Sequence, residues 1–234
     1  MKADTPMEGI IPRRIALRII RQVTEEGAYA SLALDNALKG SGLKNPDRRL
    51  VSRLVYDTLD HLVYLDYMLS KVMARDDTDI KLRNILRLGA CQILIEDRIP
   101  ESAATNLSVQ LCAETGMPGL KGVCNGILRN LIRKKDEIKL PDPFIEPVQY
   151  ASVRYSIPEW LYVRLKEDYG EEAEKILSFR QTDEGWLLRP NLTRTDDQGF
   201  EEILNGRSGN RKKQTCPMPG ELPGRWISAG MQIT

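Results

Sequence analysis

The residues whose type and spacing most clearly suggest a function are arginines that recur along one predicted helix. Arg14, Arg18 and Arg21 lie four and three positions apart, which places them on one face of a helix. Arg13 extends this arginine stripe, and no acidic residue interrupts it before Glu25. Guanidinium groups bind phosphates through paired hydrogen bonds, so the spacing suits a polyanion such as RNA. A basic stripe can equally be a solvated helix face, and the sequence alone leaves both interpretations open.

A second basic group lies at the end of another predicted helix. Arg129 and Arg133 are four residues apart and therefore share a face, and Lys134 and Lys135 follow directly. Together with the arginine stripe, these four side chains form the RNA-contacting surface that the sequence predicts.

Other kinds of chemistry find little support in the residue types present. His61 is the only histidine, so histidine-based triads and metal clusters lack their usual members. No two cysteines stand at metal-ligand spacing, and buried, reduced thiols are expected. The acidic residues at 76, 77 and 79 suit a helix N-terminus, which favours negative charge without a metal. We therefore predict no catalytic residue, no metal and no cofactor site in this sequence.

Composition and charge divide the chain into three segments. The 234 residues are 41% hydrophobic and 29% charged, and no apolar run approaches the roughly 20 residues that span a bilayer. Residues 1–139 carry 22 basic and 18 acidic side chains, residues 140–206 carry 7 and 14, and residues 207–234 carry 5 and 1. We expect a cytoplasmic protein with no membrane partner and with boundaries near residues 140 and 207.

The elements that must position the basic residues are helices. Apolar residues recur at helical spacing through residues 12–139, and strand-like alternation is absent there. The predicted helices begin near Pro12, Leu32, Asp47, Asp76, Ser102 and Gly119, with Ser102 as an N-terminal cap. The first is predicted to end at Gly27, and the helix from Asp47 continues in phase, with a break, to Val72. Short loops between them imply an antiparallel helical bundle. Residues 140–155, rich in proline at their start, are predicted to be a linker.

An ordered set of motifs in this first segment resembles the NusB-like fold. The motifs are Leu65-Asp66, the stretch from Leu86 to Leu94, Arg98-Ile99-Pro100, Ala103-Ala104, Asn106, and the stretch from Gly122 to Arg129. The resemblance implies that the arginine-rich N-terminal region binds RNA. Gly89 and the alanines are expected to let two helices approach closely. Asn125 is interpreted as a buried anchor rather than an RNA contact.

The second segment, residues 156–206, is similar to the region that follows the NusB-like domain in rRNA cytosine-C5 methyltransferases of the Sun/Fmu (RsmB) family. The matching residues are Ser156, Pro158, Trp160, Leu161, Arg189 and Asn191. In that family a helix leads to a strand at the start of a mixed α/β RNA-binding subdomain. The resemblance therefore implies a short α/β fragment here, with Arg189 and Asn191 as further RNA contacts. The residue pattern predicts a strand over residues 186–191 and a short helix over residues 197–204.

The third segment, residues 207–234, lacks a periodic apolar pattern and is predicted to be irregular or disordered. Proteins of this family continue into a Rossmann-like domain that binds S-adenosylmethionine and carries two catalytic cysteines. The corresponding motifs are absent from the printed sequence, so we interpret the chain as truncated before that domain or as a separate short protein.

Three functions remain after these observations. The leading hypothesis is the rRNA-recognition portion of an rRNA cytosine-C5 methyltransferase, inactive alone. The second is a NusB-type transcription antitermination module that binds RNA with a protein partner of the transcription or ribosome machinery. The third is a helical protein-interaction domain whose arginines are merely solvated.

The missing motifs give a first prediction. A polypeptide of the printed sequence should not bind S-adenosylmethionine, because it offers no glycine-rich turn for the cofactor. Isothermal titration calorimetry with the cofactor measures this directly. A saturable, stoichiometric heat would contradict the prediction.

Overall fold

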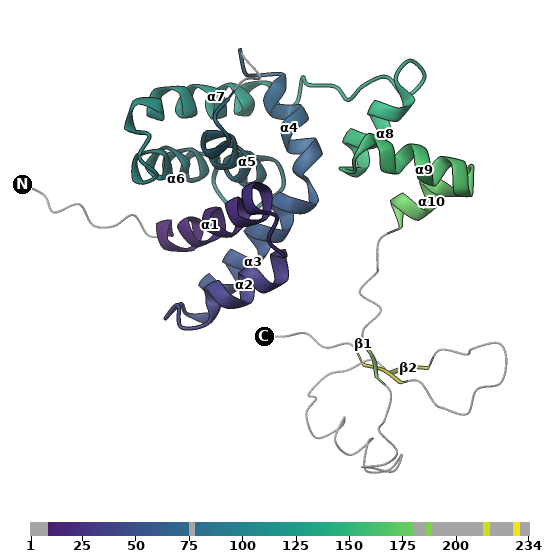
Figure 1. The fold of residues 1–234 in the computed structure, drawn as a ribbon, viewed down its shortest axis with the longest axis horizontal. Helices are drawn as coiled ribbons and strands as arrows, with labels where there is room; N and C mark the ends of the chain where they lie inside the picture. The colour runs from purple at the N-terminus through teal and green to yellow at the C-terminus, as the bar shows by residue number, and fades with distance from the viewer. Residues whose placement is uncertain (1–8, 75–77, 180–185, 189–212, 216–226, 230–234) are drawn as a thin grey trace, which may run out of the picture. The chain divides into compact units, whose positions relative to one another are not determined.

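The computed structural model describes residues 9–74, 78–179, 186–188, 213–215 and 227–229 (Figure 1). The chain forms two units, Met1–Leu177 and Ser178–Thr234. The first unit begins with a helical bundle, as predicted. Its helices are α1 (Ile10–Glu26), α2 (Ala30–Leu38), α3 (Asn45–Asp60), α4 (Leu62–Ser70), α5 (Ile80–Leu94), α6 (Glu101–Glu114) and α7 (Lys121–Lys134), with a short 3₁₀ turn at Pro118–Leu120.

Helix α5 is the centre of the bundle. It contacts α1, α3, α4, α6 and α7, which surround it in Figure 1. Nearly all of its side chains from Leu82 to Ile93 are buried. A helix that is apolar on most sides is stable only inside a core, so the composition of α5 explains its position.

One glycine lets the neighbouring helices approach α5 closely. A Cβ atom at Gly89 would lie 2.7 Å from Ser108 Oγ on α6 and 2.9 Å from Leu128 Cδ1 on α7. Both neighbours are buried. The sequence-based expectation of close helix contact at Gly89 is therefore confirmed.

Helix ends follow local rules with small shifts from the predictions. Gly27 ends α1 in the left-handed conformation, with φ +70°. The side chain of Asp79 caps α5 by accepting a hydrogen bond from the Lys81 N–H at 2.7 Å. Residue His61 separates α3 from α4, where the sequence pattern suggested one helix with a break. Helix α6 begins at Glu101 after Pro100, so the predicted cap at Ser102 is wrong by two positions.

Three further helices follow the bundle within the first unit. They are α8 (Pro147–Tyr155), α9 (Glu159–Tyr169) and α10 (Glu172–Ser178). The linker predicted over residues 140–155 is therefore wrong for its second half. Pro147 suggested a break, but it stands in the first turn of α8, where a missing backbone N–H costs nothing.

Helix α8 packs on α4 of the bundle, and a serine at the end of α8 bonds to the start of α4. Ser156 Oγ accepts hydrogen bonds from the backbone N–H groups of Val63, at 3.1 Å, and Tyr64, at 3.4 Å, at the start of α4. The backbone of Ser156 adopts the left-handed conformation, with φ 54°, and this residue ends α8. Trp160 of the same motif is 69% exposed, so it does not anchor α9 in a core.

The second unit contains a small antiparallel sheet. Its strands are β1 (Trp186–Leu188), β2 (Lys213–Thr215) and β3 (Ile227–Ala229), in the order β1-β3-β2. The strand predicted over residues 186–191 is present at residues 186–188, and residues 189–191 lie outside the described residues. Strands β2 and β3 lie within the tail that was predicted to be irregular, because three-residue strands paired over a long separation leave no local periodic signal. The helix expected over residues 197–204 lies outside the described residues.

Among the described residues, no helix combines the length and apolar character needed to cross a membrane.

The contacts of Gly89 give a prediction for stability. Gly89→Ala should lower the free energy of unfolding by about 1–3 kcal/mol, because the added methyl group overpacks the contact with Ser108 and Leu128. Urea unfolding followed by circular dichroism measures the change. The matched control is Gly126→Ala on α7, where a Cβ meets nothing within 4 Å. It should be neutral or stabilising by up to about 1 kcal/mol, and equal effects at both sites would contradict the packing argument.

Candidate nucleic-acid interface

The orientation of α1 decides which of its arginines reach the surface. Its residues Ala16, Leu17, Ile19 and Ile20 are buried, which fixes one face of the helix against the bundle. The remaining face carries Arg14, Arg18 and Arg21, as the spacing predicted. The apolar periodicity of this helix was therefore sufficient to place these three side chains at the surface.

Two of these arginines have carboxylate partners. Arg14 donates through Nε and Nη2 to Glu114 on α6, at 2.8 and 3.0 Å. Arg21 makes the same paired contact with Glu25, one helical turn further along α1, at 2.9 and 3.1 Å. These hydrogen bonds hold the pKa of the Glu114 and Glu25 carboxyls below their usual range. The positive charge at both ends of the arginine stripe is thus partly compensated.

Arg18, in the middle of the stripe, is different. It is exposed, and it has no hydrogen-bond or ion-pair partner within the part of the chain that the structure describes. It is therefore the arginine of this face most available to an incoming anion.

The inclusion of Arg13 in the stripe is wrong. This residue is 6% exposed, and its Nε donates to Gln92 Oε1 of α5 at 2.5 Å. Its Nη1 donates to the carbonyl oxygen of Gly9 at 2.9 Å. Burial also lowers the pKa of Arg13. A glutamine in the core provides the acceptor that turns this guanidinium inward, and α1 alone gives no sign of it.

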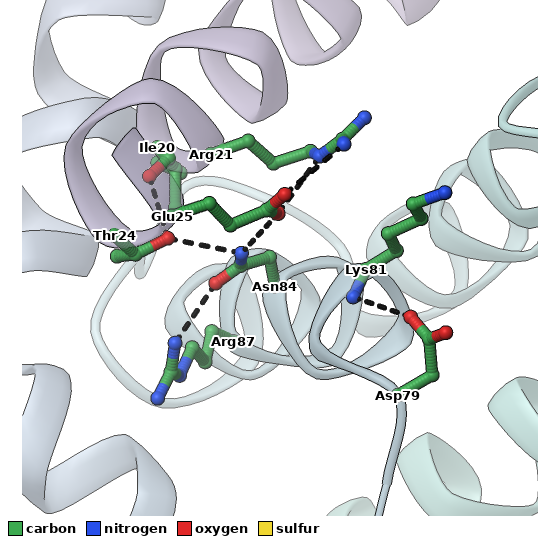
Figure 2. A network of polar contacts seen from close by, with 8 residues as sticks. All are labelled: Ile20, Arg21, Thr24, Glu25, Asp79, Lys81, Asn84 and Arg87. Atoms are coloured by element: carbon green, nitrogen blue, oxygen red, sulfur yellow. Dashed lines mark hydrogen bonds and ion pairs between the residues drawn. The ribbon is translucent and has the colours of Figure 1, made fainter. Parts of the chain in front are cut away.

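Arg21 belongs to a polar network that reaches the core (Figure 2). Glu25 accepts from Arg21 and also from Asn84 Nδ2, at 3.0 Å. Asn84 is fully buried, donates to Thr24 Oγ1 at 3.0 Å, and accepts from Arg87 Nη1 at 2.9 Å. A rigid side chain in the core therefore holds the Glu25 carboxylate in place beside Arg21.

The network ends in an ion pair between two helices. Arg87 of α5 donates through Nε and Nη2 to the Asp66 carboxylate of α4, at 2.8 and 2.6 Å. Both residues belong to motifs that the sequence analysis singled out. Their pairing shows that part of that pattern fixes α4 against α5 rather than contacting a ligand.

In the second basic group, at the end of α7, two of the four side chains have polar partners within the protein. Lys135 pairs with Glu101 of α6 at 2.8 Å, and Arg133 donates to Asn130 Oδ1 at 3.3 Å. Arg129 and Lys134 are exposed and have no polar partner among the described residues. These two side chains carry the available charge of the α7 surface.

Helix α6 separates the two basic groups. Arg14 pairs with Glu114 at its last residue, and Lys135 pairs with Glu101 at its first. Thirteen steps along a helix at about 1.5 Å each separate these anchors by roughly 20 Å. The structure therefore does not join the two groups into one patch.

Beside Arg129 lies a polar pocket that the sequence analysis missed. Asn106 of α6 and Lys121, Asn125 and Arg129 of α7 line a cavity of about 310 Å³. Asn125 is only half-buried and makes no hydrogen bond within the described residues, so its interpretation as a buried anchor is wrong. The spacing of Asn125 and Arg129 placed them on one face of α7, but Asn106 joins them only through the packing of α6 on α7.

Two predicted contacts cannot be placed. Arg189 and Asn191 lie outside the described residues.

No cluster of three or more potential metal ligands occurs in the described part of the chain. Cys91, Cys112 and Cys124 are free and buried, and burial raises the pKa of Cys91 to about 12. The Cys91 thiol is therefore protonated near neutral pH and is a poor nucleophile. Cys112 differs, because a hydrogen bond with Cys124 lowers its pKa.

Comparison with known proteins gives a consistent family assignment. The family described as the NusB family matches residues 11–133. The crystal structure of PH0851 superposes with a TM-score of 0.61 at 18% identity, covering 100% of this chain and 51% of that one. At this level of identity the likeness concerns the fold alone.

Sequence relatives extend the similarity beyond the helical bundle. A probable ribosomal RNA small subunit methyltransferase B from Synechocystis sp. is 31% identical over 93% of this chain and 52% of its own length. The protein of that name from Bacillus subtilis is 31% identical over 79% of this chain and 41% of its own length. The ribosomal RNA small subunit methyltransferase B of Escherichia coli is 31% identical over 82% and 43%. The chain thus spans about half the length of the curated relatives it matches.

The buried network behind Arg21 gives a prediction. Asn84→Ala should lower the free energy of unfolding by about 2–4 kcal/mol, because it removes hydrogen bonds to three partners and leaves buried polar groups unpaired. Chemical unfolding in urea measures the loss. The matched control is Asn36→Ala, an exposed asparagine on α2 with no polar partner in the described part of the chain. A loss at Asn84 no larger than at Asn36 would show that the network contributes little to stability.

Proposed function

Because this chain belongs to the NusB family, we propose that its helical bundle binds structured RNA through the exposed face of α1. We further propose that the chain is the rRNA-recognition portion of a small-subunit rRNA methyltransferase. The observation that carries the first proposal is the exposed arginine face of α1, in which Arg18 has no partner among the described residues. A cytoplasmic location follows from this function.

The extent of the sequence similarity supports the methyltransferase proposal over an antitermination factor. The NusB match ends at residue 133, whereas the relative from Synechocystis aligns with 93% of the chain. The additional length contains α8, α9 and the Ser156 contact to α4. A bundle acting alone would not need this helical extension.

The ion pairs on α1 are compatible with RNA binding. Exposed ion pairs contribute only about 0–1 kcal/mol, so a phosphate can replace Glu114 at Arg14 at little cost. Arg18 gives up no partner when it binds. Arg21 keeps Glu25, which Asn84 holds in place, so its guanidinium contributes less positive charge than the other two.

The proposal predicts a salt-dependent loss of RNA affinity in one variant. Replacing Arg14, Arg18 and Arg21 together with Gln should weaken binding to structured rRNA fragments. The slope of log affinity against log salt should flatten by about one for each phosphate that the variant no longer binds, because fewer counterions are released. Filter binding over a salt series measures both effects.

A charge-matched control separates the stripe from net charge. Lys44, Arg49 and Arg98 are exposed, have no polar partner among the described residues and lie outside both basic groups. Replacing these three with Gln removes the same charge and should change affinity much less. If the two triple variants bind RNA equally well at every salt concentration, the α1 face is only solvated. The proposal of a helical protein-interaction domain would then take precedence.

A further inference from the structure

A groove between α1 and α2 is lined by Arg18 and by residues that neither the sequence patterns nor the proposed function uses. Its volume is about 410 Å³. Helix α1 contributes Arg18 and Gln22, and the start and outer face of α2 contribute Tyr29, Leu32 and Asn36. Alanines from α2 and the loop before it complete the lining.

The aromatic ring of this groove is displayed to solvent. Tyr29 is 78% exposed, in a chain in which only 6% of residues are aromatic. Its backbone is nevertheless fixed, since its carbonyl oxygen accepts a hydrogen bond from the Ala33 N–H at 3.0 Å at the start of α2. The side chain itself makes no capping hydrogen bond. Next to it, Leu32 is 61% exposed and extends the apolar surface.

The polar side chains of the groove have no hydrogen-bond partners among the described residues. Arg18, Gln22 and Asn36 make no side-chain hydrogen bond within the described residues. None of the described residues that line the groove is acidic, so no carboxylate among them competes for the guanidinium. The carboxamides of Gln22 and Asn36 each offer a donor and an acceptor.

We infer that this groove binds one unpaired RNA nucleotide, with the base stacked on Tyr29 and the adjoining phosphate paired with Arg18. The inference rests on the proposed RNA-binding function and deepens it. Stacking on an exposed aromatic ring is the usual way in which proteins hold unpaired bases, and the carboxamides suit the base edge or the ribose 2′-hydroxyl. The volume lies near the lower end of small-molecule pockets, about 300–1,000 Å³, which fits one nucleotide and excludes a duplex.

The charge of the groove favours this occupant over a peptide. A protein segment would have to bring a carboxylate to Arg18 and would leave two carboxamides to be matched individually. A nucleotide supplies the anion, the flat ring and the polar edge in one unit.

The test compares single-stranded with paired RNA on the full chain. Fluorescence anisotropy is measured with a labelled unstructured RNA oligonucleotide and with a duplex of the same length. Tyr29→Ala should weaken binding of the single strand by about tenfold, the loss expected of one stacking platform, and should leave duplex binding unchanged. Tyr29→Phe should bind the single strand as the parent does, because stacking needs the ring and not the hydroxyl.

Two further variants complete the design. Tyr169→Ala, at a 54% exposed tyrosine at the end of α9, is the control and should change neither affinity. Leu32→Glu places a negative charge in the groove without touching the core, and it should reproduce the selective loss. It also keeps the test decisive if Tyr29→Ala is poorly folded.

These measurements distinguish the nucleotide groove from RNA binding by the α1 face. If Tyr29→Ala and Leu32→Glu bind the single strand as the parent does while the α1 triple arginine variant still loses affinity, the nucleotide groove is refuted and RNA binding stands. An equal loss on the duplex would also refute it, because stacking cannot explain that loss. A parent chain that binds neither RNA would overturn the proposed function and the groove together.

Discussion

The burial of α5 is the constraint on which the rest of the bundle depends. This helix is enclosed by five others, so each polar side chain on it must find a partner inside the protein. Gln92 receives Arg13 of α1, Asn84 binds Thr24 and Glu25 of α1, and Arg87 binds Asp66 of α4. These contacts lock α1 and α4 onto α5 in one register, since an unpaired polar group in the core is costly.

That register determines the charge of the outer surface. With α1 held at Gln92 near its start and at Asn84 near its end, the helix cannot rotate about its axis. One arginine is turned inward and three remain outside, of which two meet carboxylates and Arg18 has no partner among the described residues. The electrostatic character of the face is thus a consequence of core packing, although all four arginines belong to α1, a helix with an exposed face.

Close packing has a similar role on the other side of α5. Gly89 leaves room for Ser108 of α6 and Leu128 of α7, which brings these two helices together. The polar pocket of Asn106, Asn125 and Arg129 forms where they meet. A larger residue at position 89 would separate the helices that form this pocket. One small residue in the core thereby influences a surface site that it does not touch.

The sequence by itself determined the helical bundle, the end of α1 at Gly27 and the outward face of Arg14, Arg18 and Arg21. Each of these follows from local periodicity, capping or conformational preference, which are properties of neighbouring residues. The tertiary structure alone decided that Arg13 is buried, that Glu114 pairs with Arg14, and that Asn125 faces Asn106 rather than the core. It also decided that Pro147 starts a helix and that β3 pairs with both β1 and β2. Partners drawn from another helix or a distant strand leave no trace in the spacing of a single segment, and for this reason only the folded chain assigns them.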